Sequence, residues 1–431
     1  MTVEHKILYR YPLGNSKRLW RQDNFVLSSF QGKGENKRNA VENWKESGLT
    51  MVELGWADHD EAWEVVRLCE EVGLDLIFQD FSEFGGMQEW HREDVRSETM
   101  AKDIADKIRP WKRTVGYYVW DEPFKDDQLE ETRRQIDMIE KEDPERLGFT
   151  VAIPSYNGVY TWENGEFPAY LRRYADIIEP SVMSLDYYPI GIEGWTKLGQ
   201  LDNSRMWLDL EMMRKICREK NLPLWFYFQS YDLHKRGSGF IFPMARMMMY
   251  AACLYGAKAL QNFTAPHSIT NMKGDKGQYF EEFCVINREF QKLGNTLMAL
   301  DSKYVFHSDD LLTERMDTYA EGLPTDAISD SALLGGTLPA RTSAGELYDE
   351  YGNKYLLILN RDYEKDVFFA LSLKEESRIY LVDRKDGRQR VINDSTNEIH
   401  VHLKAGDAVL VRVQPAKEEA FTVEYRLDKN K

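Results

Sequence analysis

The chain has 431 residues, enough for one large folded domain and a smaller second one. Hydrophobic residues make up 42% and charged residues 30%, as in an ordinary globular protein, while aromatic residues reach a high 13%. The net charge of −16 argues against a nucleic-acid partner, whose phosphates require a basic surface, and against binding to an anionic membrane.

Strand-like and helix-like segments alternate between residues 24 and 299. The segment HDEAWEVVRLCEEVG, for example, spaces Ala62, Val65, Val66 and Cys69 as on one face of a helix, and Gly73 provides its C-cap. In chain order, the expected strands are 24–31, 49–56, 74–82, 115–123, 147–157, 180–189, 222–232 and 257–266. The expected helices are 37–48, 59–73, 92–109, 126–142, 167–178, 203–220, 242–256 and 277–299.

Eight strand–helix units in succession favour a (β/α)₈ barrel. Each helix carries the chain back across the sheet, so successive strands pair in parallel. The number of units and their span of roughly 280 residues match such a barrel. An open doubly wound sheet is the competing architecture, but the turn FQGKGENKRN is a poor match to the Gly-rich phosphate turn of that fold.

After about residue 305 the pattern changes to short alternating strands. The runs YLLILNRDY, VFFALSL, RIYLVD, EIHVHL and AVLVRVQP are separated by Gly, Asn, Asp and Lys, which is typical of an antiparallel β-sandwich. The expected fold class is therefore α/β. It comprises a (β/α)₈ TIM barrel over 1–305, a linker region over 306–345 and a small β-sandwich domain over 346–431.

The cysteines and the N-terminal segment bear on the cellular compartment in which the protein is expected. Cys69, Cys217, Cys253 and Cys284 form no CxxC pair, so we expect buried free thiols. Residues 1–14 lack the apolar core of a signal peptide, and no run of about eighteen apolar residues is present. We expect a cytoplasmic protein, or a secreted or periplasmic one whose signal peptide has been removed. Whether it forms a homo-oligomer is open.

The ends of the eight expected strands carry mostly carboxylates, amides and aromatic rings. In a TIM barrel these ends bear the reactive groups, because the βα loops meet there. They include Trp56, Asp80, Glu83, Asp121, Glu122, Asn157, Asp186, Tyr187, Tyr188, Gln229, Tyr231, Asp232, Asn262 and His267. Cations and Gly-rich turns, which a phosphate-binding barrel needs at its last two strands, are missing. The adjacent pair Asp121 and Glu122 is thus expected at the mouth of the barrel.

Side-chain alternation sharpens the choice among these residues, because every second residue of a strand faces the same side. One side is shared by Gly116, Tyr118, Trp120 and Glu122 in the fourth strand, and by Ser184, Asp186 and Tyr188 in the sixth. We therefore expect Asp186 to point inward. Glu53 of the second strand can point inward too, and its ordinary interpretation is a buried carboxylate held by neighbouring hydrogen bonds.

The sequence WDEP at the end of the fourth strand resembles the Asn-Glu-Pro signature of clan A glycoside hydrolases. The C-terminal β-domain is similar to those of β-galactosidase-like members of that clan. The resemblance implies that Glu122 is the general acid/base, with Asp121 in place of the family's Asn. The family's nucleophile is a Glu at the end of strand seven, where this chain has FYFQSY, with Gln229 near that position. A neutral amide cannot form a glycosyl ester, so the nucleophile position is atypical.

Cleavage of a glycosidic bond requires a proton donor and a second carboxylate with a different pKa. Glu122 is the expected general acid, because the neighbouring Asp121 raises the pKa of one member of the pair. Asp186 is the first choice for the second carboxylate, and Asp80 the second. At ~6.5–9.5 Å from Glu122, Asp186 would activate water and invert the anomer; at ~5–5.5 Å it would attack directly and retain it. The alternative for the DEP sequence is a helix N-terminal cap.

The remaining strand-end residues suggest how a carbohydrate would be bound. Gln229 and Asn262 are candidate hydroxyl-binding amides, and Asp80, Asp121 and His267 are further candidate contacts. The candidate stacking rings are Trp56, Trp120, Tyr187, Tyr188 and Tyr231. The histidines show no HxH or HExxH spacing, so we expect no metal, and no other cofactor is implied.

The strand-end residues leave three functions open. The first is a glycoside hydrolase that acts on an oligosaccharide or glycoside through Glu122. The second is a non-catalytic carbohydrate-binding TIM barrel that has lost its nucleophile, in which Glu122→Gln would alter binding only. The third is a barrel lyase or isomerase, which would need a metal or a Lys that the strand ends do not offer.

Overall fold

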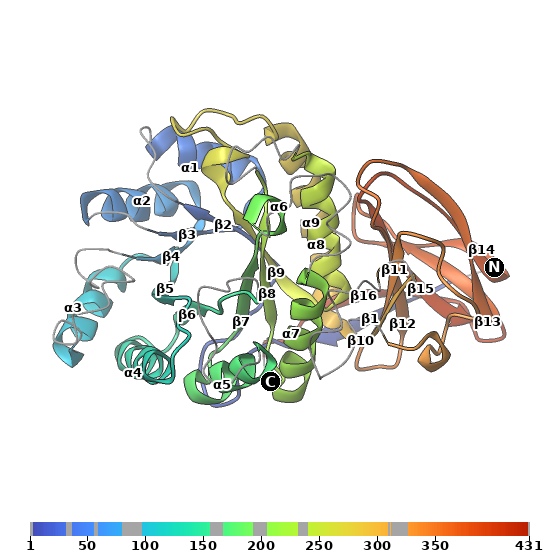
Figure 1. Ribbon diagram of the computed structural model, residues 1–431, viewed down its shortest axis with the longest axis horizontal. Helices are drawn as coiled ribbons and strands as arrows, with labels where there is room; N and C mark the ends of the chain where they lie inside the picture. Colours follow the sequence, from blue (N-terminus) through green and yellow to red (C-terminus); the bar gives the residue numbers. More distant parts are fainter. Residues whose placement is uncertain are drawn as a thin grey trace.

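The computed structural model describes residues 3–31, 37–55, 59–79, 97–155, 167–192, 205–231, 240–308, 311 and 326–429. These residues form a TIM barrel and, beside it, an antiparallel β-domain (Figure 1). Five of the strand-end residues given by the sequence lie outside the described ranges: Trp56, Asp80, Glu83, Asn157 and Asp232. None of the described helices is long and apolar enough to span a membrane.

Within the described residues, eight parallel strands form the barrel in the order β6-β5-β4-β3-β2-β9-β8-β7. They are β2 (Val26–Gln31), β3 (Met51–Leu54), β4 (Asp75–Phe78), β5 (Thr114–Asp121), β6 (Leu147–Val151), β7 (Met183–Tyr187), β8 (Leu224–Gln229) and β9 (Ala257–Phe263). The ring closes where the N–H of Ala152, just after β6, donates to the carbonyl of Ser184 in β7 at 2.8 Å. The expected barrel is confirmed.

Helices surround the barrel and connect its strands (Figure 1). They are α1 (Lys37–Glu46), α2 (His59–Val72), α3 (Glu98–Ile108), α4 (Asp126–Glu142), α5 (Phe167–Ile178), the short α6 (Pro189–Ile192), α7 (Met206–Lys220), α8 (Phe242–Leu254), the 3₁₀ turn η2 (Ala265–His267) and α9 (Phe280–Ala299). The four cysteines are buried and form no disulfide, as expected.

Strand β8 shows how the two faces of the sheet are used. All six of its residues, LWFYFQ, are buried, since helices cover the outer face and side chains fill the interior. Phe226 and Phe228 belong to the large core that includes the helices, while Trp225 and Tyr227 pack with the rings inside the barrel. This strict alternation determines which side chains can reach the barrel mouth.

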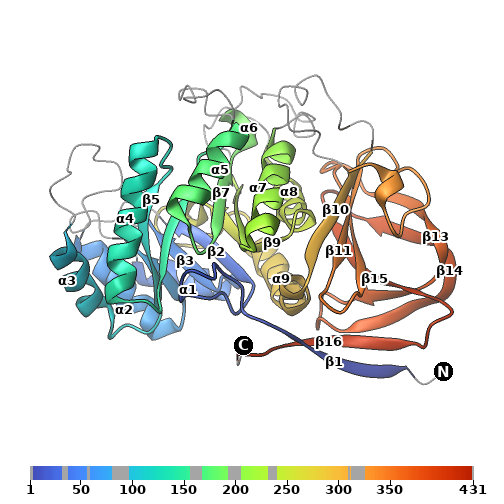
Figure 2. The same cartoon turned by 90° about the horizontal axis from the view of Figure 1, so that it is seen from below.

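The second domain is built on a six-stranded antiparallel sheet in the order β10-β11-β12-β15-β13-β14. Its elements are β10 (Asp301–His307), the 3₁₀ turn η4 (Ile328–Asp330), β11 (Thr342–Tyr348), β12 (Lys354–Asn360), β13 (Val367–Val382), β14 (Gln389–Leu403) and β15 (Ala408–Pro415). A two-stranded parallel sheet joins β1 (Glu4–Arg10) to β16 (Phe421–Leu427), and the two strands run side by side below the domain in Figure 2. The expected antiparallel β-domain is confirmed.

Two strands pair with partners that the local sequence pattern does not indicate. Strand β10 begins at Asp301, inside the expected barrel range, and already pairs with β11 of the second sheet. Strand β1 lies at the start of the chain but pairs with β16, more than four hundred residues away. A local hydrophobic pattern carries no information on such distant pairing, so only the folded chain shows it.

Candidate active site

A pocket of about 200 Å³ opens among the carboxyl-terminal ends of the barrel strands. Its acidic groups are Asp121, Glu122 and Asp186. Its other lining residues are Phe30, Tyr118, Val151, Tyr188, Tyr227 and Phe263. Among the described residues, no cationic side chain lines it. The pocket therefore combines aromatic walls with three carboxyl groups.

A β-bulge in β5 directs Asp121 into this pocket. Tyr118 pairs with Phe149 of β6, but the next paired residue, Trp120, pairs with Thr150, so β5 contains one extra residue. The extra residue interrupts the alternation of side chains. Tyr118 and Asp121 consequently both line the pocket, whereas Trp120 is not part of the lining. The simple alternation expected from the sequence, which put Trp120 on the same side as Glu122, does not hold here.

The backbone at Glu122 brings a second carboxyl group to the same pocket. Neighbouring residues of an extended strand face opposite sides. Glu122, however, has a left-handed backbone with φ 53°, so its side chain lines the same pocket as that of Asp121. This conformation costs on the order of 1 kcal/mol for a residue with a side chain. Tyr170 of α5 holds the turn: its hydroxyl donates to the carbonyl of Pro123 at 2.9 Å and accepts from the N–H of Ile153 at 3.0 Å. Strained backbone of this kind is concentrated at functional sites.

Glu122 and Asp186 form a hydrogen-bonded carboxyl pair, although they come from different strands. Burial raises the pKa of Glu122 well above its usual range, and the charges of Asp186 and Asp121 raise it further. Burial and the charge of Asp121 also raise the pKa of Asp186, but the hydrogen bond from Glu122 lowers it. Glu122 is therefore the member that keeps its proton and donates it to Asp186.

Asp121 is the third carboxyl group of the pocket, and it is partly buried. Its Oδ1 accepts a hydrogen bond from the hydroxyl of Tyr118 at 2.9 Å. Burial raises the pKa of Asp121 to about 6, while this hydrogen bond acts in the opposite direction. Asp121 consequently ionises more readily than Glu122, and its charge helps Glu122 to remain protonated.

Asp186 presents an acceptor to the pocket. It is only 7% exposed, and Tyr188 also bonds to its carboxylate. Its Oδ1 has no hydrogen-bond partner within the described ranges. Buried carboxylate oxygens are normally satisfied, so an unsatisfied one that lines a pocket is available to a ligand.

Of the sequence-based site residues, the structure brings Asp121, Glu122, Asp186 and Tyr188 together in the pocket. Tyr187 is fully buried in the core between sheet and helices, because it alternates with Asp186 and Tyr188. It does not line the pocket, which corrects the expectation that it forms a stacking wall.

The two candidate amides are placed differently from the expectation as well. Gln229 is fully buried, and its side-chain amide forms hydrogen bonds with the backbone. It accepts from the N–H of Ile190 and donates to the carbonyls of Ile190 and Tyr231. Asn262 is 1% exposed, and its Nδ2 donates to the hydroxyl of Ser268 at 3.4 Å. Neither amide is among the pocket-lining residues.

Tyr231 and His267 lie next to the pocket rather than in it. Their rings stack at 4.5 Å, and the ring of Tyr231 lies 6.4 Å from that of Phe263, which does line the pocket. They extend the aromatic wall outward. A contact with a bound ligand therefore stays a prediction for these two residues.

The sequence-based site missed Phe30, Tyr118, Val151, Tyr227 and Phe263. Most of them are inward-facing residues close to a strand end. Phe263 directly follows Asn262, whose polar side chain made it the predicted ligand contact at this strand end. A search for inward aromatic positions just below each strand end would have found Tyr118 and Tyr227. The strand ends themselves could not be located to within a residue.

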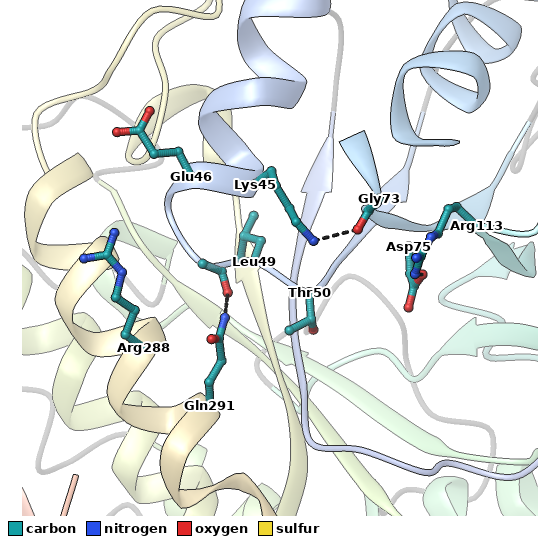
Figure 3. Close-up of a pocket in the computed structure, with 10 residues that line it drawn as sticks. Lys45, Glu46, Leu49, Thr50, Gly73, Asp75, Arg113, Arg288 and Gln291 are labelled. Atoms are coloured by element: carbon teal, nitrogen blue, oxygen red, sulfur yellow. Dashed lines mark hydrogen bonds and ion pairs between the residues drawn. The ribbon is translucent and has the colours of Figure 1, made fainter. Parts of the chain in front are cut away.

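A second hollow, of about 450 Å³, lies at the opposite end of the barrel. Figure 3 shows Lys45 donating to the carbonyl of Gly73 at 2.6 Å and Gln291 donating to the carbonyl of Gly48 at 2.7 Å. Arg113 pairs with Asp75 at 3.2 Å. Helices α1 and α2 end here, and cations near the carbonyl end of a helix stabilise it. Helix capping thus explains Lys45, the ion pair with Asp75 explains Arg113, and we assign the hollow no part in the chemistry.

No protein-family model matches the sequence, and no curated protein matches it. Solved structures resemble its fold. A family GH27 β-L-arabinopyranosidase from Geobacillus stearothermophilus has a TM-score of 0.51 and 9% identity, over 92% of this chain and 97% of that one. A candidate α-galactosidase from Bacteroides fragilis has a TM-score of 0.50 and 10% identity, over 90% of this chain and 79% of that one. At such identities the likeness shows the fold alone, a TIM barrel with a second domain.

Proposed function

We propose that this protein is a glycoside hydrolase of the clan A type, with Glu122 as its general acid. The observation that carries the proposal is the hydrogen-bonded pair of Glu122 and Asp186, in which one carboxyl group holds a proton and the other is an acceptor. Two carboxyl groups with separated pKa values are the usual requirement for cleaving a glycosidic bond.

In this mechanism Glu122 transfers its proton to the glycosidic oxygen as the bond to the anomeric carbon breaks. Asp186 supplies negative charge to the oxocarbenium-like carbon, either by direct attack or by activating a water molecule. Asp121 is not consumed. Its charge keeps the pKa of Glu122 high, so that the acid is still protonated near neutral pH.

The aromatic walls support a carbohydrate as the ligand. Sugars present flat C–H faces, which pack well against rings, and the lining provides rings from four different strands or strand ends: Phe30, Tyr118, Tyr227 and Phe263. The barrels that this fold resembles are described as glycosidases, which is compatible with the proposal at the level of fold only. The proposed partner is therefore a glycoside or oligosaccharide.

The test is hydrolysis of a panel of aryl glycosides and oligosaccharides by the wild type, Glu122→Gln and Asp186→Asn. We expect the wild type to cleave at least one member and both variants to lose ~10³-fold or more of kcat. The exposed Glu130 of α4 provides a matched control, because Glu130→Gln should leave the rate unchanged. Full activity of Glu122→Gln would overturn the proposal. The helix-cap alternative for the DEP sequence does not hold, because α4 begins only at Asp126, with Lys125 as its N-cap. Binding of sugars without cleavage would replace the proposal by a non-catalytic carbohydrate-binding barrel.

A further inference from the structure

Glu53 of β3 is a fully buried carboxyl group to which the proposed mechanism assigns no role. Its Oε1 accepts from the hydroxyl of Ser28 at 2.5 Å and from the amide of Gln261 at 2.9 Å. Ser184 donates to the other end of the Gln261 amide at 2.7 Å, which fixes the NH₂ group toward Glu53. Neutral polar partners from two neighbouring strands, β2 and β9, thus hold the carboxyl group in one orientation.

A row of paired residues connects this group with the pocket. Ser28 pairs with Gln261, Gln261 with Tyr227, and Tyr227 with Asp186, so the row crosses β2, β9, β8 and β7 in one layer of the barrel. The hydroxyl of Tyr227 faces Glu53, and neither this hydroxyl nor Glu53 Oε2 has a hydrogen-bond partner among the described residues. Tyr227 also lines the pocket together with Asp186. Tyr227 is therefore the link between Glu53 and the carboxyl pair.

The protonation state of Glu53 determines what the Tyr227 hydroxyl can do, because that hydroxyl has only one proton to donate. A neutral Glu53 can donate its own proton to the Tyr227 oxygen, which leaves the Tyr227 proton for the pocket. An ionised Glu53 can only accept, so the Tyr227 hydroxyl donates its hydrogen bond to Glu53, and the carboxylate adds a negative charge next to Tyr227. The titratable groups that face Tyr227, besides Glu53, are Asp121, Asp186 and Tyr118.

Burial favours the neutral state. It raises the pKa of Glu53 to about 7, although the hydrogen bonds from Ser28 and Gln261 and the nearby Tyr227 hydroxyl act in the opposite direction. No solvent reaches the side chain, which has 0% exposure. The neutral acid is consequently the main form below neutral pH.

We propose that Glu53 is a positioning residue, a protonated acid that donates to the Tyr227 oxygen and so leaves the Tyr227 proton available to a substrate hydroxyl in the pocket. The catalytic consequence rests on the proposed hydrolase function. When Glu53 ionises, Tyr227 turns toward it, and the rate falls on the alkaline side of the pH profile.

The variant Glu53→Gln tests the idea, because it keeps the shape and the neutral charge but cannot ionise. We expect kcat near pH 6 to stay within ~3-fold of the wild type, and the alkaline limb of the profile to move to higher pH and become less steep. Tyr227→Phe should lower kcat, and in that background the further change Glu53→Gln should no longer move the alkaline limb. The matched control is Glu346→Gln, since Glu346 is equally buried but belongs to the second sheet. An unchanged alkaline limb in the single variant Glu53→Gln would overturn the inference.

A second measurement needs no turnover. Infrared spectra of the free protein should show the carbonyl band of a protonated carboxyl group at pH 6 that Glu53→Gln lacks, and this band should fade as the pH passes about 7. If the band is absent, Glu53 is ionised and the inference is wrong, even if the wild type cleaves glycosides. If the band is present but no glycoside is cleaved, the proposed function fails while the neutral state of Glu53 stands.

Discussion

The side chains of Glu122 and Asp186 are joined by a hydrogen bond across the mouth of the barrel, one from the end of β5 and the other from β7. Strand β6 lies between these strands. Two buried carboxyl groups in contact cannot both ionise cheaply, so the pair retains a proton at a pH where free carboxyl groups have lost theirs. Their titration is a property of the pair rather than of either residue.

The charge of Asp121 should set the pH range of activity. It raises the pKa of both Glu122 and Asp186, so Asp121→Asn should lower both values and move both limbs of the bell-shaped profile to lower pH. The measurement is kcat/KM from about pH 4 to about pH 9. Asp103→Asn, at an exposed position of α3, should leave the profile unchanged. A profile of Asp121→Asn that coincides with the wild type would contradict the assignment.

The contact between Glu122 and Asp186 predicts retention of the anomeric configuration. The hydrogen-bonded groups are closer than either mechanism requires, and a substrate has to separate them. Opening to ~5–5.5 Å for direct attack needs a smaller movement than opening to ~6.5–9.5 Å for an intervening water. NMR of the first-formed product should therefore show the anomer of the substrate. The opposite anomer would assign Asp186 as a base that activates water.

A single added methyl group should disturb the pocket wall at Gly55. A Cβ built there would lie 1.9 Å from the ring of Phe30, and Phe30 lines the pocket. Because the ring is the free end of a side chain, Gly55→Ala should push it into the pocket and raise KM by ~10-fold or more with less effect on kcat.

Gly336 provides the control for this change. A Cβ at Gly336 would meet nothing closer than 3.9 Å, so Gly336→Ala should leave both kinetic constants unchanged. An unaltered KM in Gly55→Ala would show that Phe30 is not part of the substrate-binding surface.

The buried acids should also make the protein less stable at higher pH. Glu53 ionises near pH 7 in the folded protein but at its ordinary value of 4.5 when unfolded, so the native state binds more protons between these values. The free energy of unfolding therefore falls as the pH rises through this window. Glu53→Gln should make the fall smaller by about 1–3 kcal/mol between pH 5 and pH 8 in urea titrations. A fall as steep as in the wild type would mean that Glu53 ionises normally.

Much of the fold followed from the sequence because its causes are local. The alternation of helical and strand periodicities over 24–299 predicts a parallel sheet with returning helices, and this prediction is confirmed. The change to short alternating strands likewise predicted an antiparallel second domain. The pairing of β1 with β16 was not predictable, since it depends on segments at opposite ends of the chain.

The site was predicted in part. The position of Asp121, Glu122 and Asp186 at strand ends could be read from the sequence, and the pocket contains all three. The prediction that Tyr187 and Gln229 contact the ligand rests on their residue types and on their positions at strand ends. A shift of one residue along a strand, however, reverses the direction of a side chain. Tyr227 was overlooked because a tyrosine in a buried strand is as common in a core as at a ligand.

The sequence by itself determined that acidic and aromatic residues would gather at one end of a parallel barrel, because hydrophobic periodicity and strand ends are local properties of the chain. Only the tertiary structure decided which of those residues meet. The extra residue in β5 turns Asp121 inward, and the left-handed backbone at Glu122 turns its side chain to the same side. Closure of the ring between β6 and β7 then brings Asp186 within hydrogen-bonding distance. These contacts depend on the register between strands, which packing of the whole barrel sets.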